Sequence, residues 1–292
     1  MTQTVATDTT RAYDALVSLF SGENVLVLSG AGISTGSGIP DYRGPNGQHR
    51  VDKPITLPEF LASTRVQQTY WARSHIGWER FRAATPNAAH QAVAALETAG
   101  AVQTVVTQNV DGLHQAAGSR KVVELHGRLD TVICLGCRVV SDREEYAVRL
   151  RAANPTFHAH VINDTLRPDG DVLLADQLVA TFRTVACEVC GGVMKPNVVM
   201  FGEHIPGSRF RDALTTLTTA NALVVLGSSL TVGSGYRFVL DAKRQGLPVA
   251  IVTRGMTRAD SHADVKIDTD LCLLLPRVAE TVAPTPKRPG VT

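Results

Sequence analysis

The sequence predicts an α/β fold: a doubly wound parallel sheet with a smaller inserted module and a helical insertion. Three observations predict it. Short apolar runs recur along the chain, as expected for strands that are buried on both faces of a parallel sheet. Helical patterns separate several of these runs, which implies right-handed crossover connections. Between residues 131 and 193 this alternation stops, and two Cys-x-x-Cys pairs occur there instead.

Composition narrows the class of protein. The chain has 292 residues, enough for a substantial core, and its 44% hydrophobic and 19% charged content is typical of a globular protein. A net charge of +2 and 5% aromatic residues give no reason to expect a nucleic-acid partner. No apolar stretch reaches the length of a membrane span, and residues 1–10 carry no signal-peptide core. We therefore expect no membrane partner and a cytoplasmic location.

The expected strands end in small or polar residues, which places candidate binding groups at the carboxyl edge of the sheet. These strands are residues 25–28, 102–107, 122–125, 223–226, 249–252 and a sixth candidate, 265–267. Apolar spacing typical of helices occurs at residues 11–20, 58–81 and 85–99. Thr85 or Asn87 is expected to cap the last of these helices, and Gly100 to end it.

A glycine-rich turn follows the first strand, with glycines at 30, 32, 36 and 38. Such a turn directs backbone N–H groups at a ligand above the sheet, which suits phosphate. It departs from the dinucleotide fingerprint of dehydrogenases, because Thr35 stands where the third glycine is expected. Residues 39–43 are also foreign to dehydrogenases, so a redox enzyme is the weakest interpretation.

Polar side chains follow the second and third strands. Gln108, Asn109 and Asp111 suit contacts with ribose hydroxyls and an amide, although a polar loop with helix caps would have the same composition. His126 ends the third strand, and histidine is the side chain best able to take a proton near neutral pH. A buried structural histidine is the alternative, but the other polar groups at this sheet edge favour a catalytic base.

The cysteines are the most specific metal signal in the chain. Cys134 with Cys137 and Cys187 with Cys190 can each place two thiolates on a tight turn, and two such pairs make a tetrahedral Zn²⁺ site. Four cysteine ligands leave no open coordination position, so the zinc, one per chain, is expected to be structural. The alternative is a set of unliganded core cysteines. Cys272 stands apart and is not expected to bind zinc.

Residues 195–203 form an extended apolar segment between the cysteine module and the sheet. Such a segment at a junction can pair with a bound peptide by accepting it as an added strand. A buried linker would show the same sequence pattern, and both interpretations remain open.

Taken together, these motifs resemble the sirtuin family, the NAD-dependent protein deacylases, over about residues 23–275. The likeness rests on residues 30–34, 38–43, 107–114, 125–127, 201–203, 227–229 and the two cysteine pairs. Residues 70–73, 77–78 and 234–238 look most like class II sirtuins. The resemblance implies a Rossmann-like domain of residues 1–44, 84–130 and 194–283, a cofactor loop and helical insertion at 45–83 and a zinc ribbon at 131–193. The proline-rich composition of residues 284–292 predicts a disordered tail.

The resemblance also implies the site residues. His126 and Asn109 would be catalytic. An acyl-lysine protein or peptide substrate would contact Tyr70, Arg73, Val199, Phe201, Gly202 and Glu203. NAD, the co-substrate, would be bound by Gly30, Ala31, Gly32, Ser34, Thr35, Asp41, Tyr42, Arg43, Gln108, Asn109, Val110, Asp111, Gly227, Ser228, Ser229, Thr253, Arg254, Gly255 and Cys272. Thr253 stands where many family members have asparagine, so the adenosine contact is expected to differ there.

In the family reaction, the acyl-lysine carbonyl oxygen attacks the anomeric carbon of the NAD ribose as nicotinamide leaves, and a histidine then deprotonates a ribose hydroxyl. The products would be free lysine, nicotinamide and O-acyl-ADP-ribose. The alternatives are protein mono-ADP-ribosyltransfer on the same scaffold and a non-catalytic module that binds NAD and zinc. Tyr70 and Arg73 resemble the Tyr-x-x-Arg pair that reads acidic acyl chains in sirtuin desuccinylases, with a helix-surface arginine as the other interpretation.

Overall fold

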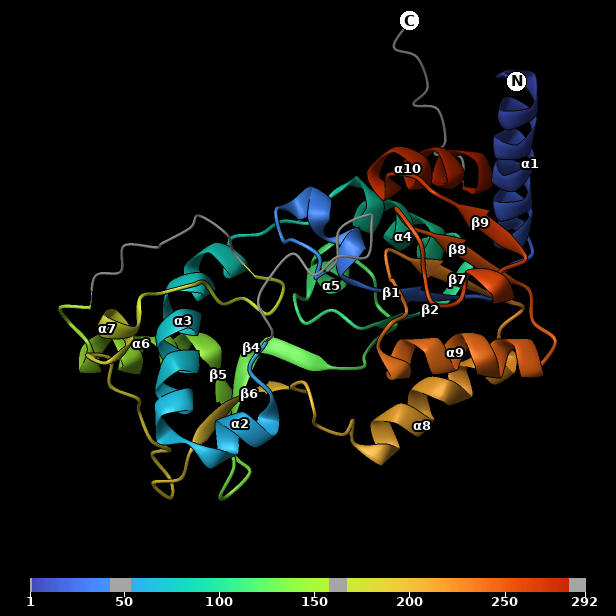
Figure 1. Cartoon of the computed structure of the whole chain (residues 1–292). Coiled ribbons are helices and arrows are strands. Elements are labelled where there is room, and N and C mark those ends of the chain that lie inside the picture. The colour runs from blue at the N-terminus through green and yellow to red at the C-terminus, as the bar shows by residue number, and fades with distance from the viewer. Residues whose placement is uncertain (1, 43–53, 158–166, 284–292) are drawn as a thin grey trace, which may run out of the picture.

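The computed structural model describes residues 2–42, 54–157 and 167–283. Figure 1 shows a large sheet with its helices on one side of the molecule and a smaller module on the other. The large sheet has six strands in the order β3-β2-β1-β7-β8-β9, and every neighbouring pair is parallel. Its strands are β1 Val25–Ser29, β2 Val102–Thr107, β3 Val122–Glu124, β7 Ala222–Leu226, β8 Val249–Val252 and β9 Val265–Ile267.

This sheet confirms the predicted doubly wound fold, including the sixth candidate strand. From β1 the chain builds outward through β2 to β3, and then returns to place β7 on the other side of β1. The strand order therefore reverses between β1 and β7, and the crevice outside the carboxyl ends of these two strands is where open α/β sheets bind ligands.

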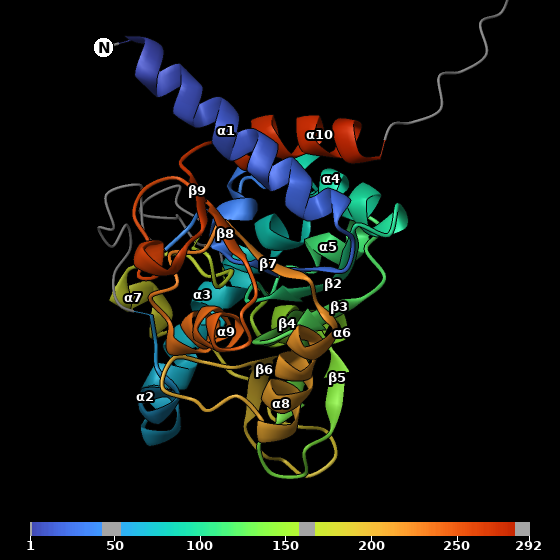
Figure 2. The ribbon, with the colours of Figure 1, turned by 90° about the vertical axis from the view of Figure 1, so that its right-hand side faces the viewer.

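Helices cover both faces of the large sheet, as Figures 1 and 2 show. The core on one face joins Leu16 and Leu96 to Val27 of β1, and the core on the other face joins Phe238 to Leu26. Alternate residues of β1 thus point into opposite cores. The first face carries α1 Thr2–Ser21, α4 Ala88–Thr98 and α10 Leu271–Val282; the second carries α8 Gly207–Thr215, η3 Thr216–Thr219 and α9 Gly233–Arg244.

Two expected helices differ in detail from the sequence prediction. Asn87, and not Thr85, caps α4 by accepting hydrogen bonds from the Ala89 and His90 amides, and Gly100 follows its end at φ +82° as predicted. The helix expected over residues 58–81 is divided into α2 Leu57–Ala62 and α3 Thr64–Arg82. The break falls at Ser63, which is extended and caps α3 through its hydroxyl, so a new helix begins in a new direction.

The small module contains an antiparallel sheet in the order β5-β4-β6. Its elements are β4 Gly127–Cys134, β5 Val140–Asp142, α6 Arg143–Ala153, α7 Asp176–Val179 and β6 Met194–Val198. Trp71 of α3 donates a hydrogen bond to the Met194 carbonyl at 3.1 Å, and its ring belongs to the same buried core as Tyr146 and Phe182. The helical insertion and the cysteine-bearing segment therefore share one core.

The small sheet extends past residues 131–193 at both ends, because β4 begins at Gly127 and β6 ends at Val198. The division of the chain into domains made from the sequence stays a prediction, as does the disorder expected for residues 284–292, which lie outside the described part of the chain. Within the described residues, no helix is both long and apolar enough to cross a bilayer.

Candidate active site

A cavity of about 680 Å³ lies between the carboxyl edge of the large sheet and the small module. It brings together most of the site residues predicted from the sequence. Those that line it are Gly30, Ala31, Gly32, Ser34, Asp41, Tyr42, Tyr70, Gln108, Asn109, Val110, Asp111, His126, Val199, Phe201, Gly202, Glu203, Gly227, Ser228, Ser229, Thr253 and Arg254. The roles of these residues stay predictions, but their convergence on one concave surface is a finding.

The glycines at the floor of the cavity are packed against one another. The Gly30 amide donates to the Leu226 carbonyl at 3.0 Å, and the Gly32 amide donates to the Gly227 carbonyl at 2.8 Å. A β-carbon on Gly227 would lie 2.4 Å from the Ile33 nitrogen, and Gly227 itself has φ +64°. The turns after β1 and β7 thus cross in direct backbone contact, which only glycine permits.

Ser34 connects the polar side chains that follow β2. The Ser34 hydroxyl donates to Asp111 Oδ2 at 2.7 Å and accepts from Asn109 Nδ2 at 3.1 Å. Asn109 Nδ2 also donates to the Gly30 carbonyl at 3.2 Å. The amide and carboxylate predicted to hold NAD are therefore oriented by hydrogen bonds to the turn that follows β1.

Two buried histidines lie beneath these groups. His90 Nδ1 accepts from the Asn87 amide, so its Nε2 carries the proton that can be donated to the Ser34 hydroxyl, 3.5 Å away. His114 Nε2 is 2.8 Å from the Ser29 hydroxyl, and the two rings lie edge to face with centroids 5.0 Å apart. Burial lowers the pKa of His90 to about 4 and that of His114 to about 3, so both stay neutral near pH 7.

The hydrogen bonds of the His126 ring define which of its nitrogens carries the proton. Its Nδ1 lies 2.9 Å from the Gln108 carbonyl oxygen, which can only accept, so Nδ1 carries the proton and Nε2 is left unprotonated. Nε2 lies 3.0 Å from the hydroxyl of Ser234, a residue that lines the cavity and that the sequence reasoning did not assign. Burial lowers the pKa of His126, with the hydrogen bond to Gln108 opposing that effect, so the neutral form is favoured.

Gln108 links His126 to the turn that follows β7. Its side-chain Oε1 accepts from the Ser228 hydroxyl at 2.7 Å, and its backbone amide donates to the Ser29 carbonyl at 2.9 Å. The turn after β7 and the His126 ring are thus both hydrogen-bonded to Gln108.

Residues 199–203 follow β6 and form part of the cavity wall on the side of the small module. The Val199 amide donates to the His126 carbonyl at 2.7 Å, and the Phe201 carbonyl accepts from the Leu57 amide at 2.8 Å. Glu203 accepts from Lys195 Nζ and from the Met200 amide, each at 2.9 Å. These bonds fix the segment, and its pairing with a bound peptide stays a prediction.

Aromatic and charged side chains form the wall at the far end of the cavity. The Tyr42 and Phe201 rings lie edge to face at 5.6 Å. Burial raises the pKa of Tyr42 and of Tyr70, and the nearby Asp169 carboxyl adds to the effect on both. Asp169 lines the cavity beside Pro168, and the sequence reasoning missed both, because no motif marks the stretch in which they lie.

Five predicted site residues do not line this cavity or cannot be placed. Thr35 turns its hydroxyl to the Gly32 carbonyl at 3.0 Å, and the Gly255 amide donates to Asp268 at 3.1 Å. Arg73, on α3, and Cys272, at the start of α10, are also absent from the cavity lining. Arg43 lies outside the described residues.

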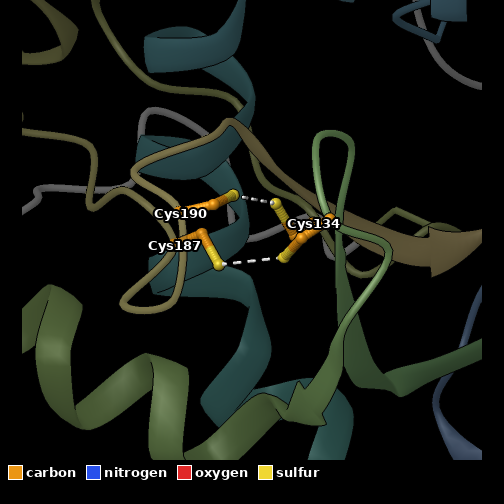
Figure 3. A group of neighbouring side chains, drawn as sticks. Cys134, Cys187 and Cys190 are labelled. Atoms are coloured by element: carbon orange, nitrogen blue, oxygen red, sulfur yellow. Dashed lines mark hydrogen bonds between the residues drawn. The ribbon is translucent and has the colours of Figure 1, made fainter.

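The four cysteines of the small module converge as predicted (Figure 3). Their sulfur atoms all lie within 4.8 Å of one another, with Cys134 to Cys190 at 3.5 Å and Cys137 to Cys187 at 3.7 Å. Tetrahedral zinc with Zn–S bonds of about 2.3 Å requires sulfur atoms roughly 3.8 Å apart, so the cluster fits a zinc ion. The site lies in the small module, away from the cavity lining.

These features define a nucleotide-binding α/β protein with a structural metal site. They are a parallel sheet whose strand order reverses, two glycine turns that cross below a polar cavity, and a module with four clustered cysteines. The chain belongs to the Sir2 family: the model of that family matches residues 30–234. The chain is 52% identical to NAD-dependent protein deacetylase 1 of Streptomyces coelicolor, over 88% of this chain and 85% of the relative. It is 47% identical to NAD-dependent protein deacylase Sirt4 of Drosophila melanogaster, over 89% of this chain and 84% of that relative.

Solved structures agree with this assignment. A structure described as Sir2 with a p53 peptide and NAD⁺ is 31% identical, has a TM-score of 0.71 and is matched over 91% of this chain and 96% of that one. A structure of a Sir2 protein bound to a propionylated peptide is 29% identical, has a TM-score of 0.70 and is matched over 91% of this chain and 97% of that one. The sirtuin family inferred from the sequence motifs is thus confirmed.

Proposed function

We propose that this chain is an NAD-dependent protein-lysine deacylase. The observation that carries the proposal is His126, whose unprotonated Nε2 faces a cavity lined by the Asn109 and Asp111 network and the glycine crossing. The relatives named as NAD-dependent deacetylases and deacylases support it. NAD supplies the ribose that accepts the acyl group and nicotinamide as the leaving group.

The chain's own residues have distinct parts in this function. His126 Nε2 takes a proton from a ribose hydroxyl, and the bond from Nδ1 to the Gln108 carbonyl stabilises the imidazolium that forms. Asn109 and Asp111, fixed by Ser34, position the carboxamide and ribose of NAD. Buried walls exclude water, so that the acyl-lysine oxygen and not solvent reaches the activated ribose. The four cysteines would hold a zinc ion, which would stabilise the small module that forms the opposite wall.

We further propose acyl-lysine proteins as the substrates, no nucleic-acid or membrane partner, and the cytoplasm as the location. The near-neutral charge of +2 supports the absence of a nucleic-acid partner.

The test is incubation with NAD and an acetyl-lysine peptide, followed by mass spectrometry of all products. Deacylation yields equimolar free lysine peptide, nicotinamide and O-acetyl-ADP-ribose. Label from NAD retained on protein would instead indicate mono-ADP-ribosyltransfer. Binding of NAD without any nicotinamide release would indicate a non-catalytic module, and either result contradicts the proposal.

A further inference from the structure

Lys195 carries a buried positive charge behind the wall of the cavity. Its side chain is only 4% exposed, and it lies in β6, shortly after Cys190 of the cysteine cluster. Lys195 itself does not line the cavity, whereas residues 198–205 line it without interruption. Along the chain, the charge therefore stands between the cysteine cluster and the part of the wall that is expected to pair with a bound peptide.

The Lys195 ammonium group connects the two ends of this part of the wall. Its Nζ donates to Glu203 Oε2 at 2.9 Å and to the Val198 carbonyl. Glu203 Oε2 also accepts from the Met200 amide at 2.9 Å, and the Glu203 amide donates to the Met200 carbonyl at 3.0 Å. The ion pair thus closes a loop from Lys195 to Glu203 and holds backbone groups of two residues inside that loop.

Burial makes the ion pair hard to exchange for other partners. It lowers the pKa of Lys195, the hydrogen bond to Glu203 opposes that effect, and the positive charges of Arg138 and Arg209 add to it. A buried ammonium without a partner is strongly unfavourable, so Glu203 cannot turn away without a large loss of free energy. Glu203 is 25% exposed and lines the cavity, so the ion pair reaches the surface that a ligand meets.

Two backbone hydrogen bonds attach the same loop to its neighbours. The Val199 amide donates to the His126 carbonyl at 2.7 Å, and the Leu57 amide donates to the Phe201 carbonyl at 2.8 Å. Gly202 has φ +77°, which lets the chain turn just before the carboxylate. These bonds fix where the loop lies, while the ion pair joins its ends and so fixes its shape.

We propose that Lys195 and Glu203 are positioning residues for the acyl-lysine peptide: their ion pair holds the backbone of residues 198–203 in the shape with which a peptide strand pairs. The inference rests on the deacylase function proposed above. It gives Glu203 an indirect role beside the direct contact expected from the sequence. Asn109 and Asp111 are held by hydrogen bonds to the turn after β1, so loss of the ion pair should weaken peptide binding and spare NAD binding.

The experiment is a double-mutant cycle on the full chain with Lys195→Met, Glu203→Gln and the variant that combines them. The Kd of a labelled acetyl-lysine peptide is measured by fluorescence anisotropy and that of NAD by calorimetry. The peptide KM, kcat and the melting temperature are measured as well. Lys243→Met is the matched control: Lys243 lies outside the cavity lining and donates to Asp264 at 2.8 Å, and Asp264 also accepts from the Val249 amide at 2.7 Å.

We expect Lys195→Met to raise the peptide Kd and KM at least about tenfold, because it leaves Glu203 unpaired and releases the Val198 carbonyl. The NAD Kd should stay within about twofold, and kcat at saturating peptide within about threefold. Glu203→Gln should raise the peptide Kd only about threefold, since the amide oxygen can still accept from Lys195 and Met200. The combined variant should lose less than the product of the two single effects, and Lys243→Met should bind the peptide as the unaltered chain does.

A peptide Kd that is the same in Lys195→Met and Lys243→Met would overturn the inference, even if the melting temperature falls. Equal losses of peptide and NAD affinity would overturn it too, because the whole site would then depend on the ion pair. If Lys195→Met does not fold, Glu203→Gln decides, and an unchanged peptide Kd in that variant contradicts the positioning role. The expected peptide Kd values in a chain that releases no nicotinamide would instead overturn the deacylase proposal and support the positioning role.

Discussion

The two walls of the cavity are built in different ways. The wall at the sheet edge consists of backbone and small polar side chains, and the neighbouring parallel strands β1 and β7, buried along their whole length, hold it in place. The opposite wall consists of large side chains from separate segments, such as Tyr42, Tyr70, Asp169 and Phe201, and it depends on the small module for its position. The difference indicates that the two walls can be perturbed separately.

Removal of zinc tests this separation with the largest expected effect. Structural zinc sites contribute about 10 kcal/mol of folding free energy, and the four cysteines join the end of β4 to the segment that precedes β6. Amides of β4 and β6 should exchange with solvent orders of magnitude faster in chelator, while amides of β1 and β7 keep their protection, as measured by hydrogen exchange and mass spectrometry. Deacylation should be lost.

A Cys272→Ser variant, which keeps all four clustered cysteines, is the control for this experiment and should respond to chelator as the unaltered chain does. Metal-free protein with full activity and unchanged exchange in β4 would show that the module does not need zinc.

His126→Ala tests the chemistry of the sheet edge. Loss of a general base lowers kcat/KM by roughly 10²- to 10⁴-fold. Affinity for NAD and the melting temperature should change little by comparison, because the Asn109 and Asp111 contacts do not involve His126. His262→Ala is the matched control, since that histidine lies outside the cavity. Similar activity of the two variants would show that another group takes the proton.

Gly227→Ala tests whether the sheet edge depends on backbone contact. The added methyl group would meet the Ile33 nitrogen at 2.4 Å, and we expect the free energy of unfolding to fall by about 3 kcal/mol, with NAD affinity falling too. Gly246→Ala is the control, because Gly246 also has a positive φ, +76°, but has nothing within 4 Å of the added atom. It should cost only about 1 kcal/mol by chemical denaturation. Equal losses of unfolding free energy in the two variants would mean that the positive φ alone, and not the contact between the two turns, requires glycine.

Most of the sheet edge could be predicted because its residues follow directly after apolar runs. Gly30, Asn109 and His126 each stand within a few residues of a strand end, and parallel strands bring those ends together. What the sequence did not reveal is the use of the glycines: Gly32 and Gly227 allow two turns to cross, in addition to any contact with phosphate. Ser234 was also missed as a partner of His126, because a serine at the start of a helix usually serves the helix itself.

The opposite wall could be predicted only in part. Paired cysteines carry their own signal, because zinc coordination demands their spacing. Asp169 carries none: it lies in an aperiodic stretch, and its neighbours Tyr42 and Tyr70 come from distant parts of the sequence. Arg73 was assigned from its spacing to Tyr70, which says nothing about the carboxyls that a remote turn sets beside it.

Buried titratable groups should give the two walls opposite pH dependences, the smallest effect expected here. The folded chain keeps His90 and His114 neutral, whereas the unfolded chain binds protons below pH about 6.5, so this contribution to the unfolding free energy falls as pH drops from there toward about 4. Burial raises the pKa of Asp171 to about 8, so the folded chain holds a proton that the unfolded chain releases above about pH 4. That contribution falls as pH rises toward 8.

Urea unfolding between about pH 5 and pH 8 separates the histidine contribution from that of Asp171, and each titrating group changes the unfolding free energy by at most about 1.4 kcal/mol per pH unit. His114→Gln removes one histidine and should flatten the gain in stability between about pH 5 and 6.5. Asp171→Asn should flatten the loss between about pH 6.5 and 8. The comparison uses the slope of the unfolding free energy against pH and not its absolute value, because each substitution also removes a buried polar partner. Slopes parallel to those of the unaltered chain in both variants would show that neither group keeps a shifted pKa in the folded state.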